Sequence, residues 1–191
     1  MTHVVIVGAY GSAGAAVAGE LADAEGIELT LIDDGDPGGG LCILKGCMPS
    51  KEVLSAGAHR FQARHDERLV GDVPDVELEA VVDRKDDNVL GWAEHRREGV
   101  HELADREGVE FVNATAEFVD DRTVRAGGET YEADYVVIAT GSTVNVPDTP
   151  GIADVEYMTS ADVLDATELP DSGIVMGFGY VGMEMVPYLA E

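Results

Sequence analysis

Basic residues are scarce in this chain. Of 191 residues only 12 are Lys or Arg, against 38 Asp or Glu, which gives a formal net charge of -26. The acids are spread along the chain and do not form a tail, so they describe an acidic surface. Nucleic acid and anionic membranes are excluded as favourable partners, because both carry negative charge. Self-repulsion of this size is typical of halophilic proteins, and we expect a protein from the cytoplasm of a salt-loving organism.

The chain also lacks a long apolar run. Its longest apolar stretch, residues 4–18, contains glycines and is shorter than the roughly 20 residues that a membrane-spanning helix needs. The stretch has no basic start of the kind that opens a secretory signal peptide. The hydrophobic content of 45% is that of a globular chain. We therefore expect a cytoplasmic protein without a membrane partner.

Cysteine is the scarcest reactive residue, since only Cys42 and Cys47 occur. A zinc site is not expected, because structural zinc needs four ligands. Five positions of an ideal helix rise about 7.5 Å, more than the roughly 4.4–6.8 Å between disulfide-bonded Cα atoms. The segment must therefore leave regular helix if the sulfurs are to meet, and Gly46 permits this. We interpret the pair as a dithiol that can close and reopen; two buried, inert cysteines are the alternative.

The cysteine pair is followed by signs of a helix. Pro49 suits the first turn of a helix, where a missing N–H costs nothing. Cys47 would then lie just ahead of the positive end of that helix, which favours the reactive thiolate. In a cytosolic protein such a pair is more often catalytic than structural.

A strand, a glycine-rich turn and a helix of small side chains open the chain. Residues 4–7 are β-branched and apolar, which is typical of a buried parallel strand. The turn carries Gly8, Gly11 and Gly14, with Tyr10 inserted into a Gly-x-Gly-x-x-Gly spacing. This pattern predicts a dinucleotide-binding turn in which Gly11 permits close approach and Gly14 packs the helix on the strand. A glycine turn without a nucleotide is the alternative.

A second strand is predicted at residues 27–32, and it ends at Asp33. In dinucleotide-binding folds an acid at the end of this strand accepts hydrogen bonds from a ribose. Asp33 is therefore a predicted cofactor contact, with Asp34 beside it. Two helical regions follow, at residues 51–69 and 76–106. Four histidines in these regions are expected on the surface, and we assign them no catalytic or ligand-binding role: His59, His65, His95 and His101.

From residue 109 onward the apolar pattern changes to a period of two. Asp120-Asp121 and Gly127-Gly128 are turn signals between short strands. These strands predict a β-meander, at residues 109–112, 115–119, 123–126 and 129–132. A buried strand is then expected from Tyr135, and it ends in the turn Ala139-Thr140-Gly141.

A second strand–turn–helix unit is predicted near residue 180. Residues 174–176 favour a strand, and Gly177, Gly179 and Gly182 follow in an undeviating Gly-x-Gly-x-x-Gly. A helix comes next, in which Pro187 predicts a kink. Two fingerprints imply two nucleotide cofactors.

Residues 39–51 read GGLCILKGCMPSK, and this string resembles the redox-active disulfide segment of the flavin-dependent pyridine nucleotide–disulfide oxidoreductases. Leu41 and Leu44 depart from the Thr and Asn that are usual in that family. The Ala-Thr-Gly turn at residues 139–141 also resembles the family's segment where the sheet returns to the flavin nucleotide. The resemblance covers essentially all of the chain but only the first part of the family's length.

The resemblance implies an α/β fold. We expect a Rossmann-like FAD-binding domain with a β-meander insert, and then the start of a second Rossmann-like domain for NAD(P). The expected boundaries are residues 1–148 for the FAD domain, 149–171 for a connecting segment and 172–191 for the start of the second domain. A half-built nucleotide domain cannot bury its apolar face, so we expect a truncated chain.

The resemblance also implies roles for single residues. Cys47 would be the thiol beside the flavin, and Cys42 the outer thiol that exchanges with substrate. Lys51 would lie near the flavin and pair with Glu184, so these four are the expected catalytic residues. The expected cofactor contacts are Gly8, Gly11, Ser12, Ala13, Gly14, Asp33, Asp34, Gly40, Leu41, Cys42, Cys47, Lys51, Ala139, Thr140, Gly141, Gly177, Gly179 and Gly182. No metal ligand is expected.

Three functions remain open at this point. The first is a dihydrolipoamide dehydrogenase, which would use FAD and NAD to oxidise a small or lipoyl-domain dithiol as a homodimer; NADP in place of NAD stays open. The second is a mercuric reductase. The third is a flavin-binding module without catalysis, which would take up flavin but show no dithiol-dependent turnover.

Overall fold

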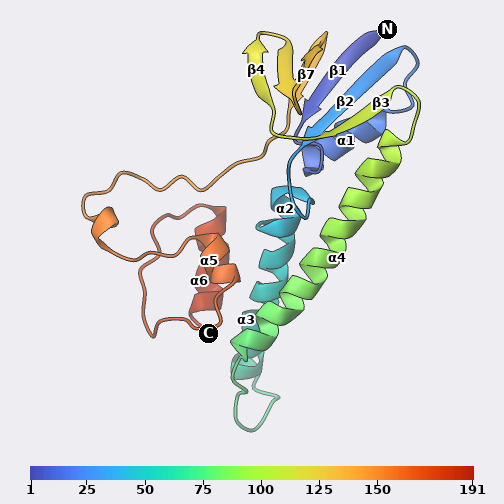
Figure 1. The fold of residues 1–191 in the computed structure, drawn as a ribbon. Helices are drawn as coiled ribbons and strands as arrows, with labels where there is room; N and C mark the ends of the chain where they lie inside the picture. The colour runs from blue at the N-terminus through green and yellow to red at the C-terminus, as the bar shows by residue number, and fades with distance from the viewer. The chain divides into compact units, whose positions relative to one another are not determined.

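A computed structural model describes residues 1–191. The chain, drawn in Figure 1, divides into two compact units. The first unit comprises Met1–Leu44 and Leu90–Thr143, and the second comprises Lys45–Val89 and Val144–Glu191. None of the helices combines the length and the apolar character that crossing a bilayer requires.

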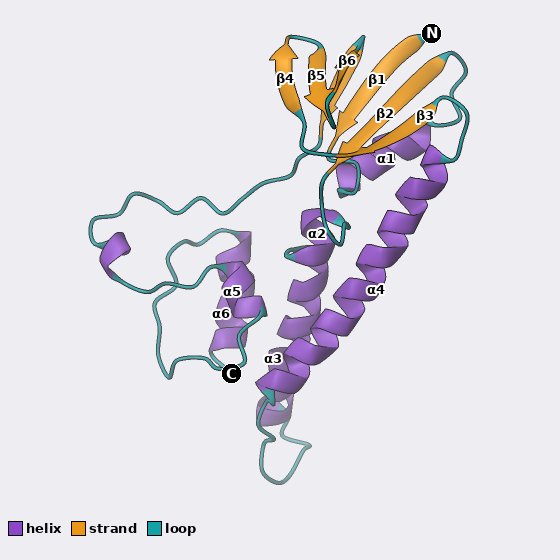
Figure 2. Cartoon of the chain, in the orientation of Figure 1, coloured by secondary structure: helices purple, strands orange, loops and turns teal.

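The first unit is built on a four-stranded parallel sheet with the order β3-β2-β1-β7, of which β1, β2 and β3 are labelled in Figure 2. The sheet and the helices near its start comprise β1 (Thr2–Val7), α1 (Ser12–Leu21), β2 (Ile27–Asp33), α2 (Gly40–Leu44), β3 (Val109–Asn113) and β7 (Tyr135–Ile138). Side chains alternate along β1: Val4 and Ile6 face the cluster that includes Ala18 of α1, while Val5 faces the opposite side. The central strands are apolar on both faces because both faces are covered.

One expected strand lies in a different sheet from the one predicted. Residues 109–112 were expected in the meander, but β3 pairs with β2 in the parallel sheet, with Leu29 opposite Val109. The reason is the preceding helix, α4 (Leu78–Ala104), drawn as the long green helix in Figure 1. A helical crossover returns the chain parallel to its start, whereas a meander needs short hairpin connections.

The meander itself is a three-stranded antiparallel sheet of β4 (Glu117–Asp120), β5 (Thr123–Ala126) and β6 (Glu129–Glu132). Gly127 and Gly128 connect β5 to β6 with φ angles of 60° and 90°, as a tight hairpin turn requires. Val124 and Ala126 are buried against Val5 of the parallel sheet. The meander therefore covers one face of that sheet.

β7 is less buried than its apolar sequence predicts. It pairs only with β1, at the edge of the sheet. Tyr135 and Ile138 keep 66% and 68% of their surface exposed. The expectation of a buried strand is thus wrong for these two residues, because a neighbour on the outer side is missing.

The second unit is helical. It contains α3 (Cys47–His65), the first part of α4, the short 3-10 helix η1 (Ile152–Asp154), α5 (Ser160–Leu164) and α6 (Tyr180–Leu189). Its core joins Val53 of α3, Val163 and Leu164 of α5, and Met185 and Tyr188 of α6. A Cβ at Gly57 would lie 3.2 Å from the Cα of Tyr188, so glycine there lets α3 and α6 approach closely.

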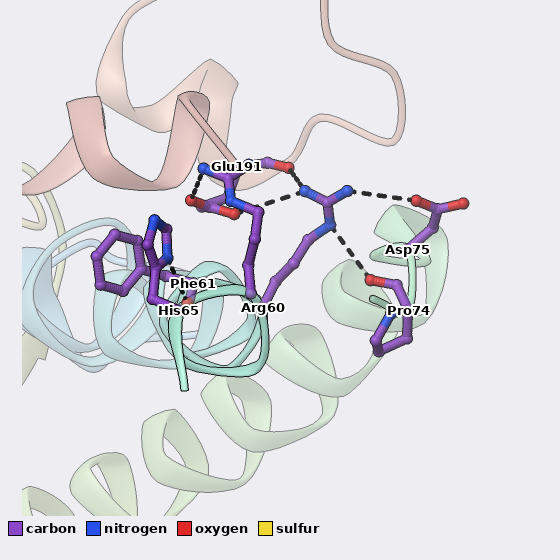
Figure 3. Close-up of polar contacts among 7 residues, drawn as sticks. Arg60, Phe61, His65, Pro74, Asp75 and Glu191 are labelled. Carbon is purple, nitrogen blue, oxygen red and sulfur yellow. Dashed lines mark hydrogen bonds and ion pairs between the residues drawn. The ribbon is translucent and has the colours of Figure 1, made fainter. Parts of the chain in front are cut away.

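Arg60 of α3 connects three parts of the second unit (Figure 3). Its Nη1 donates to the backbone oxygen of Glu191 at 2.6 Å, and its Nε donates to the carbonyl oxygen of Pro74 at 3.2 Å. Nη2 lies 3.5 Å from the carboxylate of Asp75. Arg64, one turn along α3, pairs with Glu191 at 2.7 Å.

Several element boundaries, among them both ends of α3, and one strand differ from the sequence predictions. α3 begins at Cys47 and ends at His65, where residues 51–69 were expected. The strand predicted at residues 174–176 is absent, and the segment pairs with no neighbouring strand. Ile174 is 93% exposed. A strand without a neighbour can neither form the hydrogen bonds of its backbone N–H and C=O groups nor bury its side chains. α6 continues through Pro187.

Candidate active site

The first glycine turn joins β1 to α1 in a geometry that only glycine allows. Gly8 has a φ of 95°, and a Cβ there would lie 2.3 Å from the carbonyl oxygen of Ala139. A Cβ at Gly14 would lie 2.1 Å from the carbonyl oxygen of Gly8. Gly14 is therefore the packing glycine that the sequence predicts. Gly11 caps α1, and Ser12 and Ala13 form its first turn, where N–H groups have no partner within the helix.

Two other predicted segments reach this turn. Ala139 follows β7 and donates its N–H to the carbonyl oxygen of Val7 at 2.7 Å. Gly40 opens α2, and a Cβ there would lie 2.6 Å from the Cα of Gly11. The structure thus brings the turn, the segment of residues 139–141 and the glycine loop before Cys42 together, as the sequence predicts for a cofactor site. Thr140 and Gly141 continue from Ala139, and Leu41 follows Gly40.

Asp33 lies at the end of β2, beside the same turn. Its Oδ2 accepts a hydrogen bond from the N–H of Tyr10, and its Oδ1 accepts one from the N–H of Gly35, both at 2.8 Å. The neighbouring Asp34 accepts a hydrogen bond from the hydroxyl of Thr115 at 2.6 Å. Each oxygen of Asp33 can accept a further bond, so the carboxylate is oriented by the backbone without being saturated.

Tyr10, the residue inserted into the fingerprint, is 2% exposed. Its hydroxyl lies 2.8 Å from Nε2 of His101, and its ring centroid lies 5.3 Å from that of Phe111. Burial raises the pKa of the Tyr10 phenol; the charge of Arg97 lowers that pKa and the charge of Asp33 raises it. Nη1 of Arg96 donates to the Tyr10 carbonyl oxygen at 3.2 Å. The insertion is therefore a buried anchor for the turn.

Sequence reasoning did not identify Tyr10, Arg96 or His101 as parts of this site. His101 was expected on the surface, and it is exposed, yet it also holds the Tyr10 ring. The one sequence feature that could have pointed to Tyr10 was its aromatic side chain in a turn made otherwise of small residues. Its partners on α4 could not be read from the pattern, because they lie about 90 positions further along the chain.

The cysteine segment leaves regular helix, as its spacing predicts. α2 ends at Leu44 and α3 begins at Cys47, with Gly46 at φ -127° and ψ -119° between them. Ser50 donates both its backbone N–H and its hydroxyl to the carbonyl oxygen of Gly46. Both Cys42 and Cys47, the only cysteines, are disulfide-bonded. The two cysteines are therefore bonded to each other and are not free thiols.

Lys51 and Glu184 form the ion pair that the sequence analysis predicts. Nζ of Lys51 on α3 lies 2.6 Å from Oε1 of Glu184 on α6, and both side chains are partly exposed. Exposed pairs of this kind contribute about 0–1 kcal/mol to stability. The pair therefore contributes little to holding α3 and α6 together, and its main effect is to orient the positive charge of Lys51.

The second glycine turn repeats the packing of the first. Gly177 has a φ of 107°, and Gly179 caps α6. A Cβ at Gly182 would lie 2.5 Å from the carbonyl oxygen of Gly177, which matches the contact of Gly14 with Gly8. Both turns therefore use their last glycine to seat a helix against the start of the turn.

Comparison with known proteins gives consistent matches along the chain. The sequence profile of the family described as "Pyridine nucleotide-disulphide oxidoreductase" matches residues 2–191. A mercuric reductase of Bacillus cereus is 35% identical over 179 residues, which cover 92% of this chain and 28% of that protein. A dihydrolipoyl dehydrogenase of Halobacterium salinarum is 33% identical over 200 aligned residues, covering 100% of this chain and 40% of that protein.

A solved structure is similar as well. The Cu(II) complex of the HOCl-induced flavoprotein disulfide reductase RclA from Escherichia coli superposes with a TM-score of 0.75 at 28% identity. The match covers 98% of this chain and 39% of that one. The chain thus spans well under half the length of the proteins that it matches here.

Proposed function

The chain belongs to the pyridine nucleotide–disulphide oxidoreductase family, and we propose that it acts as a flavin-dependent dihydrolipoyl dehydrogenase. This reaction would oxidise a dithiol and reduce NAD, with the Cys42–Cys47 disulfide exchanging with the substrate. One observation carries the proposal: the only two cysteines are disulfide-bonded, and they follow directly on the glycine loop that contacts the first nucleotide turn.

The site fits the flavin dinucleotide on the geometry of its glycines. A Cβ at Gly40 would lie 2.6 Å from the Cα of Gly11, so glycine at this position lets the loop before Cys42 pack directly against the first glycine turn. The N-terminus of α1 offers free N–H groups and a positive dipole end to phosphate, and Asp33 offers lone pairs to a ribose. Bound FAD would supply the two-electron redox chemistry. The residues that would hold it are Gly8, Gly11, Ser12, Ala13, Gly14, Asp33, Asp34, Gly40, Leu41, Ala139, Thr140 and Gly141.

The two sulfurs have different roles in the exchange. A substrate thiolate attacks the sulfur of Cys42, the Cys42–Cys47 bond breaks, and Cys47 leaves as a thiolate. The second substrate thiol then displaces Cys42, so the substrate leaves as a disulfide and Cys42 as a thiol. The start of α3 stabilises the negative charge on Cys47, which makes it the better leaving group.

Lys51 places a cation on α3, four residues after Cys47. Glu184 orients the ammonium group from α6 at 2.6 Å. A fixed positive charge next to a site that accumulates electrons stabilises the negative charge that develops there. We assign Lys51 this electrostatic role and Glu184 the role of orienting it.

The second glycine turn is the proposed binding site for the nicotinamide cofactor, through Gly177, Gly179 and Gly182. We propose NAD as that cofactor, a homodimer as the working assembly and the cytoplasm as the location. A small dithiol or a lipoyl domain is the proposed substrate. The dihydrolipoyl dehydrogenase from Halobacterium salinarum aligns with all of this chain, which supports this choice together with the acidic composition.

Mercuric reductase is the second candidate, because the Bacillus cereus protein of that name is 35% identical to this chain. The two functions differ in the substrate that would react at Cys42, a dithiol in one case and Hg(II) in the other. They share the remaining parts of the site. Steady-state assays of the protein separate them: dihydrolipoamide with NAD on one side, and Hg(II) with a reduced nicotinamide on the other. Turnover with dihydrolipoamide alone supports the proposal, and turnover with Hg(II) alone contradicts it.

A further inference from the structure

We propose that Arg96 is a phosphate-binding residue for the flavin dinucleotide, in addition to the glycine turn and the start of α1. The inference rests on the proposed function, since it assumes that this turn holds FAD. It concerns a side chain that the Gly-x-Gly-x-x-Gly pattern does not include, on a helix that begins more than 60 residues beyond the turn.

Arg96 differs from the other arginines of the chain in being half-buried without an acidic partner. Six of the nine arginines form ion pairs with Asp or Glu: Arg60, Arg64, Arg68, Arg84, Arg106 and Arg125. Arg97 and Arg122 are unpaired but exposed. Only Arg96 is both half-buried and without an ion pair, in a chain with 38 acids.

The position of the Arg96 guanidinium is fixed by the turn itself. Nη1 donates to the carbonyl oxygen of Tyr10 at 3.2 Å, and Tyr10 directly precedes Gly11, the N-cap of α1. A guanidinium has five N–H donors, so this single bond leaves others for a ligand. A partly desolvated cation without a counter-charge is costly, and an anion bound there would relieve that cost.

Three elements meet at the Tyr10 carbonyl. A Cβ at Gly40 would lie 3.3 Å from this oxygen and 3.1 Å from the nitrogen of Gly11. A Cβ at Gly39 would lie 3.1 Å from the Cβ of Ala93, which is one turn before Arg96 on α4. The glycine loop therefore packs on α4 at the point where α4 presents Arg96 to the nucleotide turn.

The chemistry of this place favours phosphate over other anions. The first turn of α1 supplies N–H donors and a positive dipole end, and a guanidinium matches two phosphate oxygens at once. A dinucleotide in the turn carries its pyrophosphate at the start of this helix. Arg96 would then neutralise part of the pyrophosphate charge, which matters in a protein of net charge -26.

The test measures FAD affinity of the chain by quenching of flavin fluorescence, for the wild type, Arg96→Gln, Arg96→Lys and Arg97→Gln. Gln is a polar side chain without a charge, whereas Lys keeps the charge. Arg97→Gln removes the same charge from the next residue on the same helix. We expect Arg96→Gln to weaken FAD binding about tenfold or more, and Arg96→Lys to restore most of the affinity. Arg97→Gln should stay within about twofold of the wild type.

Each outcome decides the matter. An Arg96→Gln variant that binds FAD as tightly as the wild type would overturn the role of Arg96 and leave the proposed function intact. Equal losses in Arg96→Gln and Arg97→Gln would also overturn it, because the effect would then be general charge. Equal losses in Arg96→Gln and Arg96→Lys would indicate a purely structural clamp, again against the proposal. A wild-type chain that takes up no FAD contradicts the proposed function itself.

Discussion

The carboxylate of Asp33 has two backbone donors, from Tyr10 and Gly35, each at 2.8 Å. These bonds fix the carboxylate at the end of β2, next to the first glycine turn, where the proposed cofactor's ribose would meet an acceptor already in place. The same bonds tie the inserted Tyr10 to the second strand. At the scale of single residues, the site is thus organised by backbone donors as well as by side chains.

Replacing Asp33 with Ala should weaken the retention of FAD by roughly one order of magnitude, since a charged hydrogen bond contributes about 1.5–3 kcal/mol. FAD affinity measured by fluorescence titration checks this. Glu28→Ala is the matched control, because Glu28 is an exposed acid on the same strand. Unchanged affinity in Asp33→Ala would remove Asp33 from the cofactor site.

The buried ammonium group of Lys85 should make the stability of the protein depend on pH. Burial lowers the pKa of Lys85, but hydrogen bonds to Asp165 and Asp86, together with their charges, raise it above its ordinary value of 10.5. A raised pKa in the folded state stabilises the protein at pH values below 10.5, and this contribution is lost as the pH rises through the folded-state value. The stability of the wild type should therefore fall above about pH 10.5.

Urea unfolding at pH 8 and at pH 11 measures this effect, with Asp165→Asn as the comparison. The variant removes one partner of an almost fully buried ammonium group, so it should lose stability at pH 8, by about 1–3 kcal/mol given the exposure of Asp165. The difference between the two proteins should shrink at pH 11. A difference that is equal at both pH values would contradict the role of the Lys85 charge.

Among the elements, the two strand–turn–helix units show the same contact. The last glycine of each turn lies against the carbonyl oxygen of the first, for Gly14 with Gly8 and for Gly182 with Gly177. A side chain at this position would push the helix away from the turn. Such a shift would affect the whole helix, because every N–H group of its first turn would move with it.

Gly14→Ala should therefore destabilise the chain by about 1–3 kcal/mol through overpacking, and it should lose FAD. Gly19→Ala is the matched control on the same helix, because a Cβ there meets nothing within 4 Å. That control should be neutral or stabilising by up to about 1 kcal/mol, since Ala favours helix over Gly. Thermal unfolding checks both variants, and equal effects of the two would contradict the packing role of Gly14.

The sequence pattern predicted most elements of the first unit correctly. The apolar runs of β1 and β2, the helix around Trp92 and the turn at Gly127-Gly128 all carry strong local signals. The pattern failed for β3, because a period of two does not say which sheet a strand joins. It also failed for residues 174–176, where the local preference for a strand has no partner strand to support it.

The candidate site was predictable to a similar degree. Its glycines and cysteines follow from motifs, which depend on spacing along the chain, and the Lys51–Glu184 pair was expected from the family resemblance. Arg96 and His101 could not be found in this way. Their contacts with Tyr10 depend on where α4 crosses the turn, and no local pattern reports such a crossing.

At the scale of the whole molecule, charge is the dominant feature. The ion pairs use only part of the 38 acids, and the formal net charge of -26 remains. Repulsion among these charges opposes the compact state and is screened by salt. We therefore expect the melting temperature to rise as KCl is added through the molar range. A melting temperature that is flat or falls with KCl would contradict the halophilic interpretation.

The central claim is that Cys42 and Cys47 form a redox-active disulfide with distinct roles, Cys47 toward the flavin and Cys42 toward the substrate. It is tested most directly by the long-wavelength absorbance of the FAD-loaded protein after two-electron reduction, compared between Cys42→Ser and Cys47→Ser. Cys42→Ser keeps the thiolate of Cys47 and should show the charge-transfer band between thiolate and flavin, whereas Cys47→Ser should lack it. A band that persists in Cys47→Ser and disappears in Cys42→Ser would contradict the account.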